Sequence, residues 1–428
     1  MTSTGESTGT HDDAVPRAGR STSAFGVPAF RLLWLNNIAY FLVANAERFV
    51  FGWLVLDGLD LGEAEQGLVV FAFGLPNALL VLPAGAWADR WDRRRMLMGT
   101  QIAGAVVMAA TALLVASGKA TYSLVLVAAV LSGCAAALGS PVRGSLIPSL
   151  VAKEQLFGAI ALNAIAMTMS LIAGPVLAKV VGDAFGFEGA FWFQSILMLI
   201  GIGFLVRLRL PPGARAPASL ADGEAGQRVV AQVREGLRFV KNDRPLRALF
   251  GLLLLASLTV NPAIMVTIQA HVKDGLGRTA GDAAQPMALL GAGIFITSMV
   301  ILRKTQMENR AVVFLRAMIV GAVITIAMGF TESFPVLLVL SFLMGLSGGF
   351  FVNMNQGLIQ SNTPPEMMGR VMGLFTLVAS GMMPIGALML GGLATVIGTG
   401  PTMSLAGLTS LSVVTVTYLR NQDLRRLG

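Results

Sequence analysis

The most constraining feature of this sequence is a short, highly charged turn between two long stretches without charge. Residues 85–97 hold two aspartates and four arginines, whereas Gln66 to Gly85 before them and Met96 to Gly118 after them hold no charged residue. About 20 apolar residues are enough for a helix to cross a bilayer. The pattern therefore predicts two membrane-spanning helices joined by a turn that cannot lie in hydrocarbon.

The composition extends this prediction to the whole chain. Hydrophobic residues make up 55% of the sequence and charged residues only 13%, and the mean hydropathy is +0.72. Soluble domains carry about 25% charged residues. So much apolar surface cannot be hidden in a soluble core, and we predict an all-α integral membrane protein.

Twelve apolar segments are long enough to cross a membrane. Between the sixth and seventh lies a long polar connection, residues 209–245, with an expected amphipathic helix. We predict two pseudo-symmetric six-helix bundles, residues 25–208 and 246–420, flanked by a disordered cytoplasmic tail, residues 1–24, and a short cytoplasmic tail, residues 421–428. The segments are 32–56, 66–86, 96–117, 121–142, 156–181, 189–208, 246–271, 284–302, 311–331, 334–357, 368–396 and 400–419.

Basic residues are distributed unevenly over the connections. The two tails and every second connection hold most of them. The connections in between hold only Lys119, Lys179, Lys273 and Arg278. Lysine and arginine favour the cytoplasmic side, so we expect both termini and the long connection in the cytoplasm. This topology, and anionic lipid heads beside residues 228–247, account for the net charge of +8 without a nucleic-acid partner.

The charged turn, together with the twelve segments, resembles a family signature. Gly85-x-x-x-Asp89-Arg90-x-x-Arg93-Arg94 is similar to the G-x-L-A-D-R-x-G-R-R motif between spans two and three of the major facilitator superfamily, although Trp87 and Asp92 depart from it. The wider sequence is similar to the bacterial branch with siderophore exporters and drug-efflux proteins. This resemblance implies a transporter of the bacterial cytoplasmic (inner) membrane.

The turn is expected to act as a cytoplasmic gate. The Asp89 carboxylate could accept hydrogen bonds from Arg143 and Arg93, and from the N-terminus of span eleven beside Gly369, where the helix dipole favours an anion. The resemblance implies this latch role for Asp89, for the arginines Arg90 and Arg93, and for Gly85, which lets helices approach closely. The alternative is that Arg93 to Arg95 only determine topology.

A second group of candidates lies inside span one. Glu47 is the only carboxylate well inside any predicted span, and Arg48 follows it. Ionisable residues inside membranes are commonly functional. We therefore consider Glu47 a coupling site for a proton or another cation, with Arg48 as its partner, and keep open the alternative that the two form a structural ion pair near the outer side.

Polar residues within other spans are candidates for a substrate cavity between the halves. Asn45 and Asn261 occupy equivalent points of a weak internal repeat, in which Gly174 also corresponds to Gly386. Any of these amides could instead only join two helices. The candidates are Asn37, Tyr40, Asn45, Asn77, Asn163, Asn261, Asn353 and Asn355.

Gly174-Pro175 predicts a helix kink, because proline removes a helical hydrogen bond. The pair resembles an antiporter motif, G-P-x-x-G-G, but Ala178 and Lys179 stand where its last two glycines belong. A purely structural kink explains the pair equally well.

No pattern indicates an enzyme, a cofactor or a metal site. The sequence has no nucleotide-binding P-loop, and a single cysteine, Cys134, and two histidines, His11 and His271, cannot form a disulfide framework or a metal cluster. We expect a monomer that exports small amphiphilic molecules in exchange for protons or another ion, in contact with membrane lipid. The alternatives are a gradient-driven importer of a nutrient or metal chelate, and a non-transporting receptor on the same scaffold.

Overall fold

The computed structural model describes residues 24–90, 92–209, 224–303, 309–425 and 427, without the side chains of residues 78, 81–90, 153, 157 and 224–232. Within these residues the chain is helical and has no strand, which confirms the predicted fold class. Most of the tail predicted as disordered, residues 1–23, lies outside the described residues.

The helices of the first half follow the predicted apolar segments. α5 combines two of them, and its helical backbone breaks at Gly186, whose φ of 76° favours glycine. α4 continues past its predicted end at residue 142, because Pro141 and Pro148 are accommodated inside the helix. The elements are η1 (Ala24–Gly26), α1 (Pro28–Trp53), the π-helical turn η2 (Leu54–Gly58), α2 (Glu63–Arg90), α3 (Arg93–Ala116), α4 (Tyr122–Leu150) and α5 (Lys153–Arg207).

The second half begins after an amphipathic helix, α6 (Glu224–Asn242). Asp243 caps the next helix, accepting a hydrogen bond from the Leu246 amide over 2.8 Å. Predicted segment 368–396 is two helices, since Pro384 starts a new one. The elements are α7 (Arg244–Leu258), α8 (Val260–Pro262), η3 (Ala263–Thr267), α9 (Ile268–Ala270), η4 (His271–Gly275), η5 (Ala280–Ala283), α10 (Ala284–Arg303), α11 (Arg310–Phe330), α12 (Phe334–Ser361), α13 (Met368–Gly381), α14 (Met383–Ile397), α15 (Thr399–Arg420) and α16 (Gln422–Arg425).

Ten stretches of the described chain are long and apolar enough to cross a membrane. One of them, Glu154–Arg207, contains the break at Gly186 and so holds two helices. α2, with 28 residues, is a further long helix. The structure is therefore compatible with the twelve predicted crossings.

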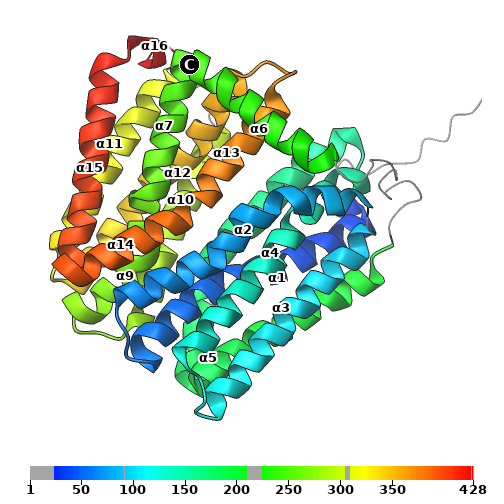
Figure 1. Ribbon diagram of the computed structural model, residues 1–428, viewed down its shortest axis with the longest axis vertical. Helices are drawn as coiled ribbons and strands as arrows, with labels where there is room; N and C mark the ends of the chain where they lie inside the picture. The colour runs from blue at the N-terminus through cyan, green and yellow to red at the C-terminus, as the bar shows by residue number, and fades with distance from the viewer. Residues whose placement is uncertain (1–23, 91, 210–223, 304–308, 426, 428) are drawn as a thin grey trace, which may run out of the picture.

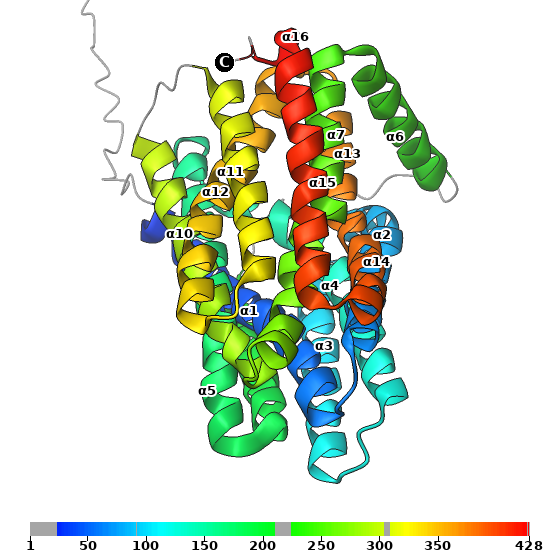
Figure 2. The same cartoon turned by 90° about the vertical axis from the view of Figure 1, so that its left-hand side faces the viewer.

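The helices gather into two groups, α1–α5 and α7–α15, which meet near α9 and α14 and diverge toward α6 (Figure 1). Across the junction α2 packs on α14, and α5 packs on α10. Figure 2 shows α6 leaving the end of α7 obliquely. We name the two ends of the molecule by the helix ends they hold. The terminal face holds Pro28, Arg90, Arg93, Leu150, Lys153, Arg207, Arg244, Arg303, Arg310, Ser361, Met368 and Arg420, and the distal face holds Gly58, Glu63, Ala116, Tyr122, Gly186, Gly275, Ala280, Phe330, Phe334, Ile397 and Thr399.

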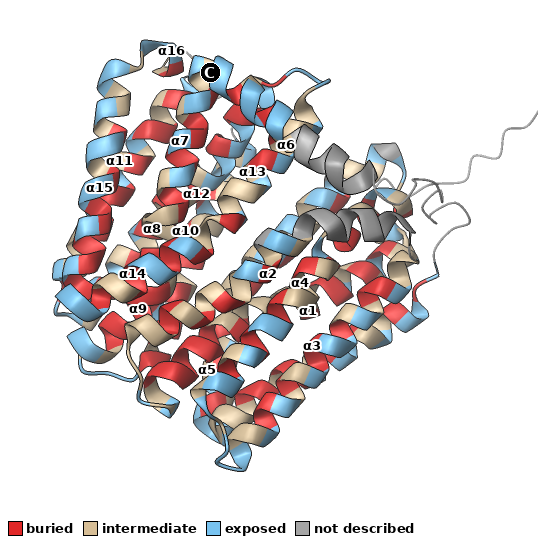
Figure 3. Ribbon diagram, in the orientation of Figure 1, coloured by how far each residue is buried: buried red, intermediate tan, exposed pale blue. Residues whose placement is uncertain are grey.

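Among the described side chains, the hydrophobic core is continuous across the two groups only toward the distal face. There, one cluster joins Phe49 and Val69 of the first half with Ile264 and Ile268 of the second. Toward the terminal face the core is divided, with one cluster around Leu33 and a separate one in the second half. Figure 3 shows buried residues inside each group and where the groups meet. Apolar packing thus seals the groups together at the distal face.

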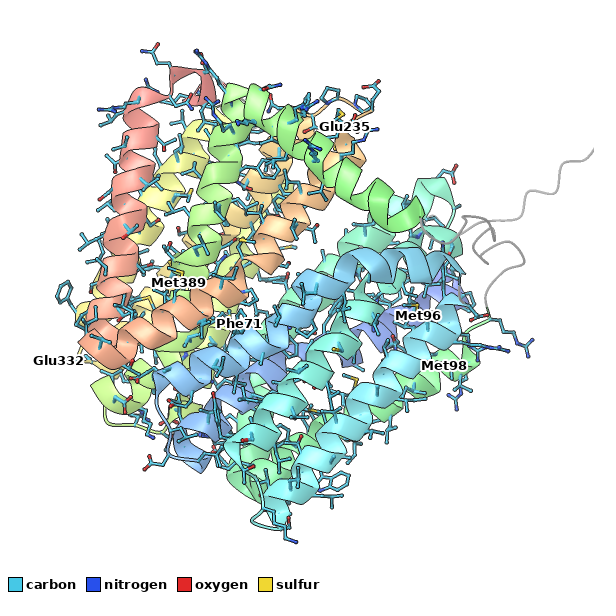
Figure 4. The ribbon with its side chains drawn as sticks, viewed as in Figure 1. Phe71, Met96, Met98, Glu235, Glu332 and Met389 are labelled. Atoms are coloured by element: carbon cyan, nitrogen blue, oxygen red, sulfur yellow. The ribbon has the colours of Figure 1, made fainter. Side chains whose placement is uncertain are left out.

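α6 lies on the terminal face and contacts both groups, since it packs on α7 and α13 and touches α2. Glu235, labelled in Figure 4, forms an ion pair with Arg370 of α13 over 3.0 Å. Gly236 allows this close approach, because a Cβ there would lie 3.0 Å from the Arg370 carbonyl oxygen. The Glu235–Arg370 pair ties α6 to the second half.

Candidate functional site

A buried polar cluster lies inside the first half, where α1, α3, α4 and α5 meet. The Arg143 Nη1 atom donates to the side-chain oxygens of Asn36 over 2.9 Å and of Asn37 over 2.6 Å. The Arg143 guanidinium also lies 3.7 Å from the centre of the Tyr40 ring, in the geometry of a cation–π contact. Asn37 in turn donates to Asn163 over 2.7 Å. Three predicted cavity residues, Asn37, Tyr40 and Asn163, therefore meet in this cluster.

Arg143 is a buried cation without an acidic partner in the part of the chain that the structure describes. Only 4% of the residue is exposed, and its Nε and Nη2 atoms have no hydrogen-bond partner. A buried charge is costly unless it is paired. The side chain, predicted to act in the gate at the end of span four, lies inside α4 and faces α1, with two donors that are buried and have no partner among the described residues.

Asn36 holds this cluster together and was missed by the sequence analysis. Its amide nitrogen donates to Gln101 and to the Gly201 carbonyl, both over 2.9 Å. Its oxygen accepts from Arg143 and, over 3.1 Å, from Gln101. Asn36 adjoins Asn37 and Gln101 adjoins Thr100 in otherwise apolar stretches, and spacing along one helix could not show that Asn36 and Gln101 meet.

We expect Asn36→Leu to destabilise the protein, because it leaves Gln101, Gly201 and Arg143 short of partners. An unsatisfied buried polar group costs about 1–3 kcal/mol. Thermal unfolding of the purified protein should show a clear fall in the midpoint. Asn353→Leu is the matched control, because Asn353 is exposed. The unfolding midpoint of this variant should stay close to that of the wild type. Equal midpoints for the two variants would contradict the role of Asn36.

Glu47 lies two helical turns beyond Tyr40 on α1 and is 5% exposed. Its Oε1 atom has no hydrogen-bond partner. Arg48 donates to the Ala44 carbonyl over 3.0 Å and to Asn45 over 3.4 Å, and among the described residues no ion pair joins it to Glu47. The geometry therefore does not favour the alternative that Glu47 and Arg48 form a structural ion pair.

The other predicted cavity residues do not join the Arg143 cluster. Asn45 bonds to the Phe41 carbonyl of its own helix over 2.9 Å. Asn353 donates to Ser298 of α10 over 3.0 Å, and the buried Asn355 donates to the Leu249 carbonyl over 3.4 Å. Asn77 and Asn261 are half-buried.

The predicted gate lies only partly within the described residues. Gly85, Asp89 and Arg90 belong to the last turns of α2, whose side chains lie outside the description. Gly369, at the start of α13, is exposed, and a Cβ there would meet no atom within 4 Å. Next to it, Arg370 is engaged by Glu235 over 3.0 Å. Among the described side chains, Glu235 is thus the acid that pairs with the start of α13.

At the distal face, a pair of buried glutamine side chains bridges the two halves. Gln66 of α2 donates to Gln269 of α9, and Gln269 donates to the Phe49 carbonyl of α1 over 3.0 Å. Both glutamines are almost fully buried. Gly52 makes room for them, since a Cβ there would lie 2.8 Å from the Gln66 Nε2 atom. Neither glutamine was among the predicted site residues.

Ion pairs surround this glutamine bridge. Lys273 pairs with Asp60 over 3.0 Å, and Lys179 lies 3.5 Å from Asp282. The Asp57 carboxylate accepts from the Ala280 amide over 2.8 Å, so each of these contacts crosses between the halves. A usable signal was present in the sequence, because Lys179 and Lys273 are rare basic residues on the side that should have few.

Glycines let the helix backbones cross closely at the distal face. A Cβ at Gly67 of α2 would lie 2.7 Å from the Ala387 carbonyl oxygen, and a Cβ at Gly391 of α14 would lie 2.6 Å from the Glu63 carbonyl oxygen. Figure 4 labels Phe71 and Met389 where these two helices cross. Small residues at such crossings permit tight packing.

Gly174 makes a similar contact within the first half. A Cβ there would lie 2.9 Å from the Leu42 carbonyl oxygen of α1, and one at Gly386 would lie 2.7 Å from the Leu258 carbonyl oxygen of α7. The two glycines thus pack alike in the two halves, as the predicted repeat requires. The chain stays helical through Pro175, and the break in α5 is at Gly186.

The described residues contain no group of three His, Cys, Asp or Glu side chains that could hold a metal ion. The arrangement offers buried polar groups inside the first half and contacts that join the two halves. Movement of the halves against each other would break the glutamine bridge, because it joins α2 to α9.

Comparison with known proteins points to one family. The model of the Major Facilitator Superfamily matches residues 33–387. The multidrug efflux pump Tap of Mycobacterium tuberculosis is 27% identical over 412 residues, which cover 93% of this chain and 95% of that protein. The staphyloferrin A transporter of Staphylococcus aureus is 22% identical over 90% of this chain and 96% of its own length. The macrolide efflux protein A of Enterococcus faecalis is 22% identical over 73% of this chain and 95% of its own length.

Solved structures share the fold at low sequence identity. A POT family transporter in complex with 5-aminolevulinic acid has a TM-score of 0.74 at 13% identity, over 94% of this chain and 98% of that one. A mutant of the nucleoside transporter NupG also has a TM-score of 0.74 at 13% identity, over 92% and 100%. These similarities concern the architecture alone.

Proposed function

Because this chain belongs to the major facilitator superfamily and is a multi-pass membrane transporter, we propose that it exports small amphiphilic molecules in exchange for protons. The observation that carries the proposal is the division of the core. One apolar cluster joins the halves at the distal face, whereas two separate clusters lie toward the terminal face. Such a shape suits a protein that opens one face while the other is closed.

The uneven distribution of basic residues supports a cytoplasmic terminal face. In that orientation we propose an inward-open state, in which a substrate would enter between the halves from the cytoplasm or its leaflet. The names of two relatives, a multidrug efflux pump and a macrolide efflux protein, favour export. A third relative is named as a transporter of staphyloferrin A, which keeps siderophore-like substrates within the proposal.

The polar cluster around Arg143 gives the first half a place to bind the polar end of a substrate. Its Nε and Nη2 donors are unused, and Tyr40 holds the guanidinium plane. An acceptor group on the substrate would satisfy donors that otherwise remain costly to bury. Glu47, near the distal seal, would carry the exchanged proton.

The transition between states requires the distal contacts to break. The glutamine bridge, the Lys273–Asp60 pair and the glycine crossing would separate together, because all of them join the two halves. On the terminal face, the Asp89 carboxylate would then bind the start of α13 beside Gly369, where the helix dipole favours an anion. The contacts formed when the terminal face closes would thereby offset the free energy lost when the distal contacts break.

We expect Asp89→Asn to leave the fold intact and to reduce transport at least ~10-fold, because loss of a charge-assisted contact of about 1.5–3 kcal/mol weakens the closed terminal face. The measurement is drug efflux by the purified variant in proteoliposomes with an imposed pH gradient. Glu366→Gln, an exposed carboxylate near the same helix start, is the control and should transport normally. Normal turnover by Asp89→Asn would refute the latch, and substrate accumulation in place of efflux would favour an importer.

A further inference from the structure

A groove runs along the outside of the first half, between α3 and α4. Its volume is about 770 Å³, and most of its wall is apolar. Figure 4 shows α3, with Met96 and Met98 labelled, at the outer edge of the first group of helices. The groove therefore opens toward the membrane. Its wall includes Gly99, Ala103 and Val107 of α3 and Leu131, Cys134 and Leu138 of α4.

Small side chains keep this groove open. A Cβ added at Gly99 would meet no atom within 4 Å, and Ala103 is exposed. The groove faces the membrane, so molecules of the bilayer have access to it. Its wall offers an apolar molecule a continuous contact surface.

The length of the groove matches one leaflet of a bilayer. From Arg95 to Val107 an α-helix rises about 18 Å at about 1.5 Å per residue. Half of a hydrocarbon core of about 30 Å is about 15 Å. The groove thus extends from the terminal face, at the level of the lipid head groups, to about the middle of the membrane.

An exposed guanidinium, that of Arg95, lies at the end of the groove that is among the head groups. Arg94 donates to the Leu205 and Val206 carbonyls over 2.7 and 2.5 Å, and Arg93 also has a partner. The side chain of Arg95 is exposed and, within the described part of the chain, forms no hydrogen bond or ion pair. Asp92, which also lines this end, is occupied as the cap of α3, accepting from the Arg95 amide over 2.9 Å.

We propose that the α3–α4 groove binds one acyl chain of a phospholipid from the leaflet at the terminal face, with the lipid phosphate on Arg95. The chain would lie over Gly99 and Cys134, and the phosphate would accept hydrogen bonds from the guanidinium. The length of the groove, its apolar wall and the exposed Arg95 at the head-group level together fit this ligand. The inference does not depend on the transported substrate.

The test is a titration of the delipidated full-length protein with phosphatidylglycerol, followed by native mass spectrometry. We expect Gly99→Leu, which fills the groove without a clash, to weaken binding of the first lipid at least tenfold. Arg95→Gln should weaken it several-fold, and millimolar inorganic phosphate should not displace the lipid. Gly203→Leu is the matched control, because a Cβ at Gly203 also meets no atom within 4 Å, and its lipid binding should equal that of the wild type.

Alkylation of the native Cys134 provides a second measurement, which needs no engineered cysteine. The sequence has one cysteine, so phosphatidylglycerol should slow N-ethylmaleimide labelling of the wild type and slow it less in Arg95→Gln. Lipid binding by Gly99→Leu equal to that of Gly203→Leu, or labelling of Cys134 that lipid does not change, would overturn the proposal. Displacement by inorganic phosphate alone would also overturn it.

Discussion

Gly391→Val is expected to hold the distal face open and to reduce transport by roughly one to two orders of magnitude. A Cβ at this position would lie 2.6 Å from the Glu63 carbonyl oxygen and 3.0 Å from the Gly67 Cα atom, so α2 and α14 could no longer cross at their present separation. Overpacking costs about 1–3 kcal/mol, and a coupling energy of that size changes an equilibrium by about 5- to 150-fold. Efflux by the purified variant in proteoliposomes is the measurement.

The next residue provides the control for this prediction. Gly392 is on the same helix, but a Cβ there would meet no atom within 4 Å. Gly392→Val should therefore transport like the wild type, although it introduces the same β-branched side chain into the same helix as Gly391→Val. If both variants lost transport equally, loss of helix propensity and not the α2–α14 crossing would be responsible.

The second large effect is expected at Glu47. Glu47→Gln keeps the size and most of the polarity of the side chain but cannot exchange a proton. We predict that uptake or efflux driven by a pH gradient falls at least ~100-fold, the lower end of what a positioned proton-transfer group contributes. Substrate binding at constant pH should be retained, because the Arg143 cluster is left intact.

Parallel measurements distinguish a coupling site from a structural residue. Transport should be measured with and without a pH gradient, and binding at two pH values. Glu65→Gln is a suitable control, since Glu65 lies in the first turn of α2 at the distal face and outside the buried cluster. A proton response in Glu47→Gln equal to that of the wild type would assign Glu47 to structure.

The helices themselves were predictable from the sequence, because apolar length decides which segments cross a membrane. The charged turn at Arg93–Arg95 separated α2 from α3, and the alternation of basic connections identified α6 as part of a polar connection. The sequence did not show where a helix would continue or break. Pro141 and Pro148 lie within α4, whereas Pro384 separates α13 from α14, and the difference depends on the neighbours of each proline.

The sites were harder to predict than the helices. Asn37, Tyr40 and Asn163 were found as isolated polar residues within apolar segments, and the structure brings them together with Arg143. Contacts between segments far apart in sequence could not be read in the same way. Gln66 lies at a helix start, and Gln269 lies in a mostly apolar stretch. Only the hydrogen bond between them, which joins the two halves, gives these residues a role.

The most direct test of the account is a distance measurement across both faces. In a Cys134→Ser background, spin labels at Ala184 and Glu332 report on the distal face, and labels at Glu154 and Arg303 report on the terminal face; all four positions are exposed. Double electron–electron resonance should show a short distal and a long terminal distance in the wild type, and Gly391→Val should lengthen the first while shortening the second. Unchanged distances in Gly391→Val, or a joint increase of both, would contradict alternating closure of the two faces.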